Sequence, residues 1–151
     1  MKLDQITILL NSIAPLEQAA DWDNVGLLLE PKQTATIQRV LLTIDLTESV
    51  VKEAIDKKVN LIICYHPILF NPIQSLCISF PADRNILSLI QKKIALYSPH
   101  TAIDHVIGGV NDWLIDGCGI GEITLINPSK DQLSGAGRLI TLNRAVSINT
   151  L

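Results

Sequence analysis

The chain has 151 residues, of which 48% are hydrophobic, and its formal net charge is −3. This length suits one domain, and the apolar fraction is ample for a core. The small negative charge argues weakly against nucleic-acid binding, which needs clustered lysine and arginine. We therefore expect no direct nucleic-acid partner.

The cysteines and the N-terminal segment indicate a soluble protein in a reducing compartment. Cys64, Cys77 and Cys118 are odd in number and form no C-x-x-C pair, as is typical of an intracellular protein. Residues 1–5 contain an acid and an amide where a signal peptide needs an apolar run. No apolar segment reaches the ~18 residues that span a bilayer. We expect no membrane partner and a cytoplasmic location, with the nucleus and the mitochondrion as open alternatives.

The hydrophobic pattern predicts helices and strands that alternate along the first hundred residues. Thr47 and Asp83 are the expected N-caps of two of the helices, and Pro67 is expected to end a strand. Polar, glycine-rich residues 127–137 predict a loop. The expected strands are 25–29, 39–46, 60–66, 94–98, 123–126 and 138–142, and the other expected helices cover 3–13 and 110–115.

The central β-α-β-α-β order predicts the fold class. Short right-handed crossovers would make the strands at 39–46, 60–66 and 94–98 parallel neighbours. We therefore expect an α/β fold with a mostly parallel sheet flanked by helices, an α-β-α sandwich. The carboxyl ends of such strands open on one edge, where ligands bind.

Polar residues lie at or just after the carboxyl end of each of these three strands. Asp45 is near the end of the first, Tyr65 and His66 end the second, and His100 and Asp104 follow the third. Because the three carboxyl ends share an edge, we expect these side chains to converge there. This inference needs only the hydrophobic pattern and the topology rules.

Imidazole and carboxylate are the usual ligands of Zn, Fe, Mn and related divalent ions. His66 and Asp104 are the best candidates for two ligands, with Tyr65 and Asp45 near the site. A tight site needs three or four protein ligands. A bound ion would lower the pKa of its water towards ~7 and supply hydroxide for hydrolysis. His100, four residues before Asp104, is the expected neighbour of a substrate or of metal-bound water, although this spacing alone is weak evidence.

Simpler interpretations stay open for each residue. A histidine before a proline is often a hydrogen-bonded strand-end residue, and Asp104 could satisfy backbone donors in an Asx-turn. Asp45 could only orient the next helix, and Tyr65 could only pack with its hydroxyl satisfied. His105 is assigned to the surface. No G-x-x-x-x-G-K-[ST] loop and no G-x-S-x-G elbow occurs in the sequence.

Four stretches in order resemble a known family: 21–27 (DWDNVGL), 65–70 (YHPILF), 98–104 (SPHTAID) and 108–114 (GGVNDWL). They are similar to the type 2 homologues of GTP cyclohydrolase 1, the Ngg-one-interacting-factor-three-like family. The resemblance implies an α/β sandwich, a ring-shaped homohexamer and a two-metal site facing the ring interior. It also implies that His66 and Asp104 bind one ion.

The sequence departs from the pattern of this family at two points. Tyr65 stands where the bacterial-type pattern has a histidine, and a phenol of ordinary pKa ~10 is a poor ligand at neutral pH. The family's remaining ligands, a histidine and a glutamate, lie on a late segment that this sequence does not contain. The resemblance therefore implies an N-terminal α/β domain at 1–127, a linker or loop at 128–137 and the start of a truncated second half at 138–151.

Together these observations predict a family member with an incomplete site for Zn, Fe or Mn. The expected activity is that of a metal-dependent hydrolase acting on a nucleotide or similar heterocycle, although no residue selects guanine. The alternative is a non-catalytic interaction or ring-forming module linked to transcriptional regulation, with protein partners.

Overall fold

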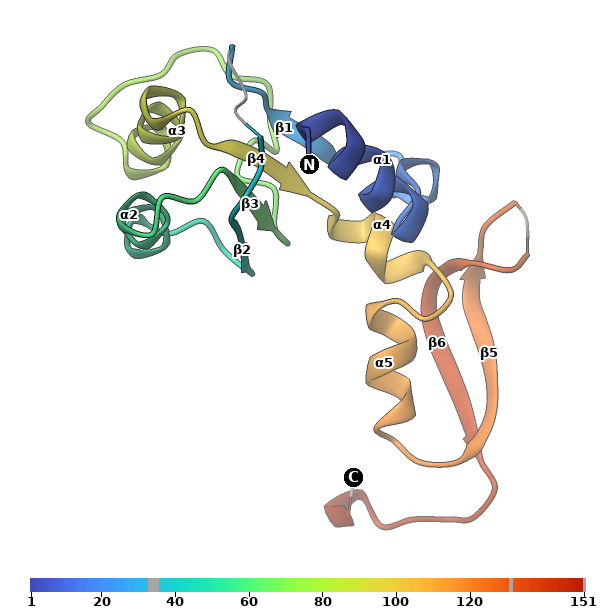
Figure 1. Cartoon of the computed structure of the whole chain (residues 1–151). Helices are drawn as coiled ribbons and strands as arrows, with labels where there is room; N and C mark the ends of the chain where they lie inside the picture. The colour runs from blue at the N-terminus through green and yellow to red at the C-terminus, as the bar shows by residue number, and fades with distance from the viewer. Residues whose placement is uncertain (33–35, 131, 151) are drawn as a thin grey trace.

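A computed structural model describes residues 1–32, 36–130 and 132–150. Its centre is a four-stranded sheet in the order β1-β4-β3-β2 (Figure 1). The neighbours β2, β3 and β4 are parallel, as predicted, and β1 runs antiparallel to β4. The predicted fold class is thus confirmed. The strands are β1 (Gly26–Leu29), β2 (Val40–Thr43), β3 (Leu61–Cys64) and β4 (Ala95–Ser98).

Helices cover both faces of the sheet because alternate strand residues point to opposite sides. Leu61 and Tyr97 pack with Leu3 on one face. Ile62 and Leu96 belong to the core cluster on the other face. The first face is covered by α1 (Leu3–Ile13), and the second by α2 (Glu48–Asp56) and α3 (Pro81–Lys92).

The starts of α2 and α3 test the two predicted N-caps. The Thr47 hydroxyl accepts a hydrogen bond from the backbone N–H of Val50, so the first prediction is confirmed. The second prediction is wrong, because α3 begins at Pro81, a residue favoured at the first helical position. Asp83 therefore lies inside the first turn, where it accepts a hydrogen bond from the backbone of Cys77.

A second group of elements follows the sheet (Figure 1). The strands β5 and β6 form an antiparallel hairpin that lies apart from the four-stranded sheet. Their connection is 129–134, so the strands are longer and the loop shorter than predicted. Residue 131 of the predicted linker and residue 151 of the predicted second half lie outside the described residues. The elements are α4 (His100–His105), α5 (Val110–Asp116), β5 (Gly121–Pro128) and β6 (Gly135–Leu142), with short 3-10 turns at η1 (Leu16–Gln18) and η2 (Ile148–Thr150).

One buried guanidinium joins the hairpin to the helices. Arg138 on β6 is 4% exposed and forms an ion pair with Asp112 on α5. The same guanidinium donates to carbonyls at the end of α4 and within β6, so its donors are used. These carbonyls belong to His105, Val106, Gly135 and Gly137.

Candidate functional site

The predicted polar residues do meet at the carboxyl ends of the parallel strands. Tyr65 and His66 directly follow β3, and His100 begins α4, separated from β4 by Pro99 alone. The ring centroids of Tyr65 and His66 are 4.9 Å apart. The ring of His100 lies 5.5 Å from that of Tyr65 and 5.6 Å from that of His66. We call Asp45, Tyr65, His66, His100 and Asp104 the strand-end cluster.

Asp45 orients the imidazole of His66. Its Oδ1 accepts a hydrogen bond from His66 Nδ1 at 2.7 Å, and both side chains are more than half exposed. With Nδ1 as the donor to the carboxylate, the lone pair of the neutral ring is on Nε2. His66 thus presents an acceptor nitrogen at the mouth of the sheet.

Tyr65 binds Asp104 through its hydroxyl. The phenol donates to Asp104 Oδ1 at 2.6 Å, while the Ser98 hydroxyl holds the carbonyl of Tyr65 at 2.7 Å. Burial, the hydrogen bond to Asp104 and the nearby negative charges raise the pKa of Tyr65 well above its ordinary value. The phenol therefore remains protonated at neutral pH. It serves as a donor to Asp104 and not as a phenolate ligand.

Cys64 lies beside the cluster as a buried thiol. Burial and the charge of Asp45 raise the pKa of its thiol to about 11. The thiol donates to the carbonyls of Ile44 and His66 at 3.3 and 3.1 Å. Cys64 is 1% exposed, so its thiol packs in the core beside the cluster.

Asp23 is a site residue to which the sequence reasoning gave no role. Its side chain has no exposed area, and both carboxylate oxygens lie 2.9 Å from His100 Nδ1. Thr101 donates to the same carboxylate through its backbone and its hydroxyl. Burial opposes the charge, but the bonds from Thr101 and His100 outweigh it and lower the pKa of Asp23. Asp23 stands inside the 21–27 motif, 77 residues before its partner, and spacing gives no signal for such a contact.

The backbone of His100 is strained. Its φ angle is +28°, in a region that residues with a side chain rarely adopt. Such conformations cost about 1–3 kcal/mol and persist only where surrounding contacts hold them. The bonds from His100 and Thr101 to Asp23 are such contacts.

The cluster fits a divalent ion by donor type but not by donor number. Imidazole and carboxylate suit Zn, Fe or Mn. However, no group of three or more His, Cys, Asp or Glu side chains placed to hold an ion occurs among residues 1–32, 36–130 and 132–150. A tight site needs three or four ligands. The described residues alone therefore do not supply the ligands of a tight site.

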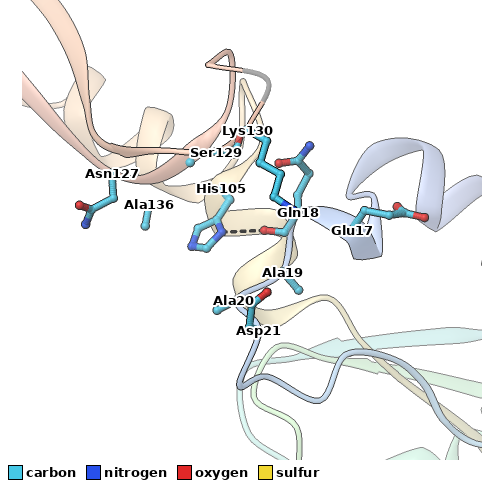
Figure 2. A pocket seen from close by; sticks show the side chains of 11 residues that line it. Glu17, Gln18, Ala19, Ala20, Asp21, His105, Asn127, Ser129, Lys130 and Ala136 are labelled. Atoms are coloured by element: carbon cyan, nitrogen blue, oxygen red, sulfur yellow. Dashed lines mark hydrogen bonds between the residues drawn. The ribbon is translucent and has the colours of Figure 1, made fainter.

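A separate pocket of about 410 Å³ lies between η1, α4 and the hairpin (Figure 2). His105 is the one histidine that lines it, and no member of the strand-end cluster does. His105 Nδ1 donates to the carbonyl of Gln18 at 2.7 Å, as the dashed line in Figure 2 shows. The side chain is partly buried there, so its assignment to the surface was only partly right. This bond explains why His105 does not join the cluster.

The fold and the cluster define an α/β protein with a polar site at the carboxyl ends of its parallel strands. The whole chain, residues 1–151, matches the family described as Duf34/NIF3 (NGG1p interacting factor 3). The chain belongs to this family, as the sequence motifs predicted.

Its relatives include NIF3-like protein 1 of Drosophila melanogaster, 45% identical over 136 residues, or 90% of this chain and 47% of that protein. NGG1-interacting factor 3 of Saccharomyces cerevisiae is 36% identical over 99% of this chain and 58% of that protein. Among solved structures, a Bacillus cereus protein related to NIF3 has a TM-score of 0.78 at 32% identity, covering 85% of this chain and 35% of that chain. Reduced HcgD from Methanocaldococcus jannaschii has a TM-score of 0.72 at 26% identity, covering 87% of this chain and 56% of that chain. This chain thus spans about half the length of these two curated relatives.

Proposed function

We propose that the strand-end cluster is part of a divalent-metal site with His66 and Asp104 as ligands. The observation that carries the proposal is the bond between His66 Nδ1 and Asp45. A carboxylate on one ring nitrogen is the usual companion of a metal on the other, because it fixes the tautomer and the ring orientation. The ion proposed is Zn, Fe or Mn.

The hydrogen bonding of the Asp104 carboxylate supports the same proposal. Its Oδ1 accepts the phenol of Tyr65, whereas Oδ2 makes no hydrogen bond to any described residue. One oxygen is thus held and the other is open to a cation. Tyr65 orients this carboxylate, as Asp45 orients the imidazole of His66.

For the reaction we propose hydrolysis of a nucleotide or a similar heterocycle. The support is the family resemblance together with the donor set, because such a set can hold an ion that acidifies water. His100, in ring contact with Tyr65 and His66, is the neighbour proposed to meet the substrate or the water. The residues of the cluster give no preference for guanine.

The test is metal binding by the full chain after treatment with a chelator. Calorimetric titration with Zn²⁺ and Mn²⁺ should show one site, weakened at least about tenfold in His66→Ala and in Asp104→Asn. His105→Ala is the matched control, since that imidazole lies in the separate pocket and binds Gln18. Equal affinity in the wild type and His66→Ala would refute the metal site.

A second proposal is an interaction or ring-forming module with protein partners, linked to transcriptional regulation. The name of the yeast relative, NGG1-interacting factor 3, supports the part of this proposal that concerns a protein partner. Large apolar side chains on α5 and next to it also lie in solvent: Trp113 is 74%, Leu114 56% and Ile120 83% exposed. Such patches are typical of association surfaces. Light scattering on the purified chain tests the proposed homohexamer, and a monomer at all concentrations would contradict it.

The proposed location is the cytoplasm, with the nucleus and the mitochondrion as alternatives. Within the described ranges, no helix has the length and apolarity that crossing a membrane requires. Imaging of the tagged chain in its own cells would distinguish the three compartments.

A further inference from the structure

His100 and Asp23 form a buried pair whose geometry sets the state of the imidazole. A carboxylate accepts hydrogen bonds, so Nδ1 of His100 must be the donor in both 2.9 Å contacts. The proton of the neutral ring is then on Nδ1, and the lone pair is on Nε2. No described residue makes a hydrogen bond to that Nε2.

We propose that Asp23 is a positioning residue that locks His100 as the Nδ1–H tautomer, so that Nε2 accepts a hydrogen bond from a ligand in the strand-end cluster. The ligand group is a donor, such as a water, a hydroxyl or an amine. The identity of that ligand rests on the proposed function, but the tautomer does not.

The carboxylate of Asp23 is surrounded by donors alone. Besides His100 Nδ1, it accepts from the backbone N–H of Asn24 at 2.8 Å and from that of Thr101 at 3.1 Å. The Thr101 hydroxyl donates to it as well, and the backbone of Ala20 donates to that hydroxyl at 3.0 Å. Every lone pair of the buried carboxylate is therefore occupied in one orientation. Because an ionised carboxylate has no hydrogen-bond donor, His100 Nδ1 meets an acceptor in every orientation of the Asp23 side chain.

The surroundings of the ring fix its position as well. Trp22 lies 6.3 Å from His100 between ring centroids, in an edge-to-face arrangement, and Tyr65 and His66 approach from β3 at 5.5 and 5.6 Å. The side chain is 18% exposed, so a ligand can reach part of it. Asp23 and Trp22 are adjacent, so one short segment supplies both the carboxylate and a ring contact.

A structural role for Asp23 is the alternative, because its bonds to Thr101 also hold 20–24 against α4. The two roles differ in what they predict for the imidazole. A structural role leaves the tautomer of His100 free to follow solvent, where imidazole favours the Nε2–H form. A positioning role fixes the Nδ1–H form whenever an acceptor oxygen stands at residue 23.

The experiment is long-range ¹⁵N–¹H correlation NMR on the metal-free full chain at a pH where His100 is neutral. The wild type should show a pyrrole-type shift at Nδ1 and a pyridine-type shift at Nε2. Asp23→Ala should lose this pattern, with the two shifts averaging or exchanging, whereas Asp23→Asn should retain it in large part through the amide oxygen. Asp21→Asn, a neighbouring exposed carboxylate, is the matched control and should leave the spectrum of His100 unchanged.

A wild-type imidazole protonated at Nε2 would overturn the proposal, as would an Asp23→Ala spectrum like that of the wild type. If Asp23→Ala does not fold, the tautomer of His100 is measured in Thr101→Val instead. That variant loses the hydroxyl bonds but keeps the acceptor for His100, so it should lower stability while leaving the tautomer as it is. A changed tautomer in Thr101→Val would refute the role of Asp23. No metal is present in these measurements, so they are independent of whether His66 and Asp104 bind an ion.

Discussion

Tyr65 acts in this site as a hydrogen-bond donor. Its phenol is held protonated by burial and by Asp104, to which it donates at 2.6 Å. A neutral histidine at this position would be a good ligand for an ion, whereas a phenol that keeps its proton is a poor one. The residue therefore orients the carboxylate of Asp104, which is one of the two proposed ligands.

The two tyrosines of the chain provide a matched pair for testing this role. Tyr65→Phe removes the donor to a carboxylate and should lower the free energy of unfolding by about 1.5–3 kcal/mol. Tyr97→Phe should be neutral or stabilising, because the Tyr97 hydroxyl is buried without a partner among the described residues. Urea unfolding of both variants in chelator measures the difference. Equal effects would contradict the account of Tyr65.

At the scale of elements, the ion pair between Asp112 and Arg138 holds α5 against β6. Arg138 is 4% and Asp112 23% exposed, so water screens the pair only in part. Burial raises the pKa of Asp112, but the bonds from Arg138 and from the backbone of Gly108 outweigh it and lower the pKa below its usual value. A carboxyl with a lowered folded-state pKa stabilises the fold only while it is ionised.

This pair should make stability depend on pH in a defined direction. Its contribution should be fully present above about pH 4, the ordinary pKa of aspartate, and be lost as pH falls through the lower folded-state value. Asp112→Asn should therefore destabilise the protein by about 1.5–3 kcal/mol at pH 7 and by less at pH 3. Asp116→Asn, an exposed carboxylate one turn further along the same helix, is the control. A difference that grows on acidification would contradict this account.

The pairing of the three parallel strands and the meeting of Tyr65, His66 and His100 could be predicted because both depend on local pattern. Short crossovers between apolar runs fix parallel neighbours, and the residues after each run must then share an edge.

The starts of helices were less predictable, since Asp83 and Pro81 both favour a helix beginning and the proline determined the position.

Contacts between distant segments could not be predicted from the sequence. Asp23 reaches His100 across 77 positions and Asp112 reaches Arg138 across 26. Nothing in hydrophobic spacing encodes such pairs, because each depends on how loops pack after the sheet has formed. The hairpin strands were predicted too short because glycine favours a loop in isolation, whereas Gly135 lies within β6, paired with Pro128.

At the scale of the whole molecule, the edge strand β2 leaves apolar side chains in solvent. The edge strand β2 presents Val40 and Leu42 towards the face that α1 covers elsewhere, and they are 45% and 74% exposed. Ile44, just after the strand, is 65% exposed. An apolar edge strand in solvent is a site of pairing with another chain.

The purified chain should therefore self-associate, and Leu42→Lys should reduce this association. The substitution should change the free energy of unfolding by less than about 0.5 kcal/mol, since the side chain is exposed. Leu41→Lys is the contrasting variant and should unfold the protein, because Leu41 packs against the core. Light scattering over a range of concentrations measures the association. A wild type that stays monomeric throughout would contradict the role of this edge.

The central claim is that His66 and Asp104 face one cation at the mouth of the sheet. Paramagnetic broadening by Mn²⁺ in the NMR spectrum of the labelled full chain tests it most directly, because the effect falls steeply with distance from the ion. The account predicts that sub-stoichiometric Mn²⁺ broadens the signals of His66, His100 and Asp104 together, and that His66→Ala abolishes the effect. Broadening centred on Glu17 and Asp21 instead, or none at all, would contradict it.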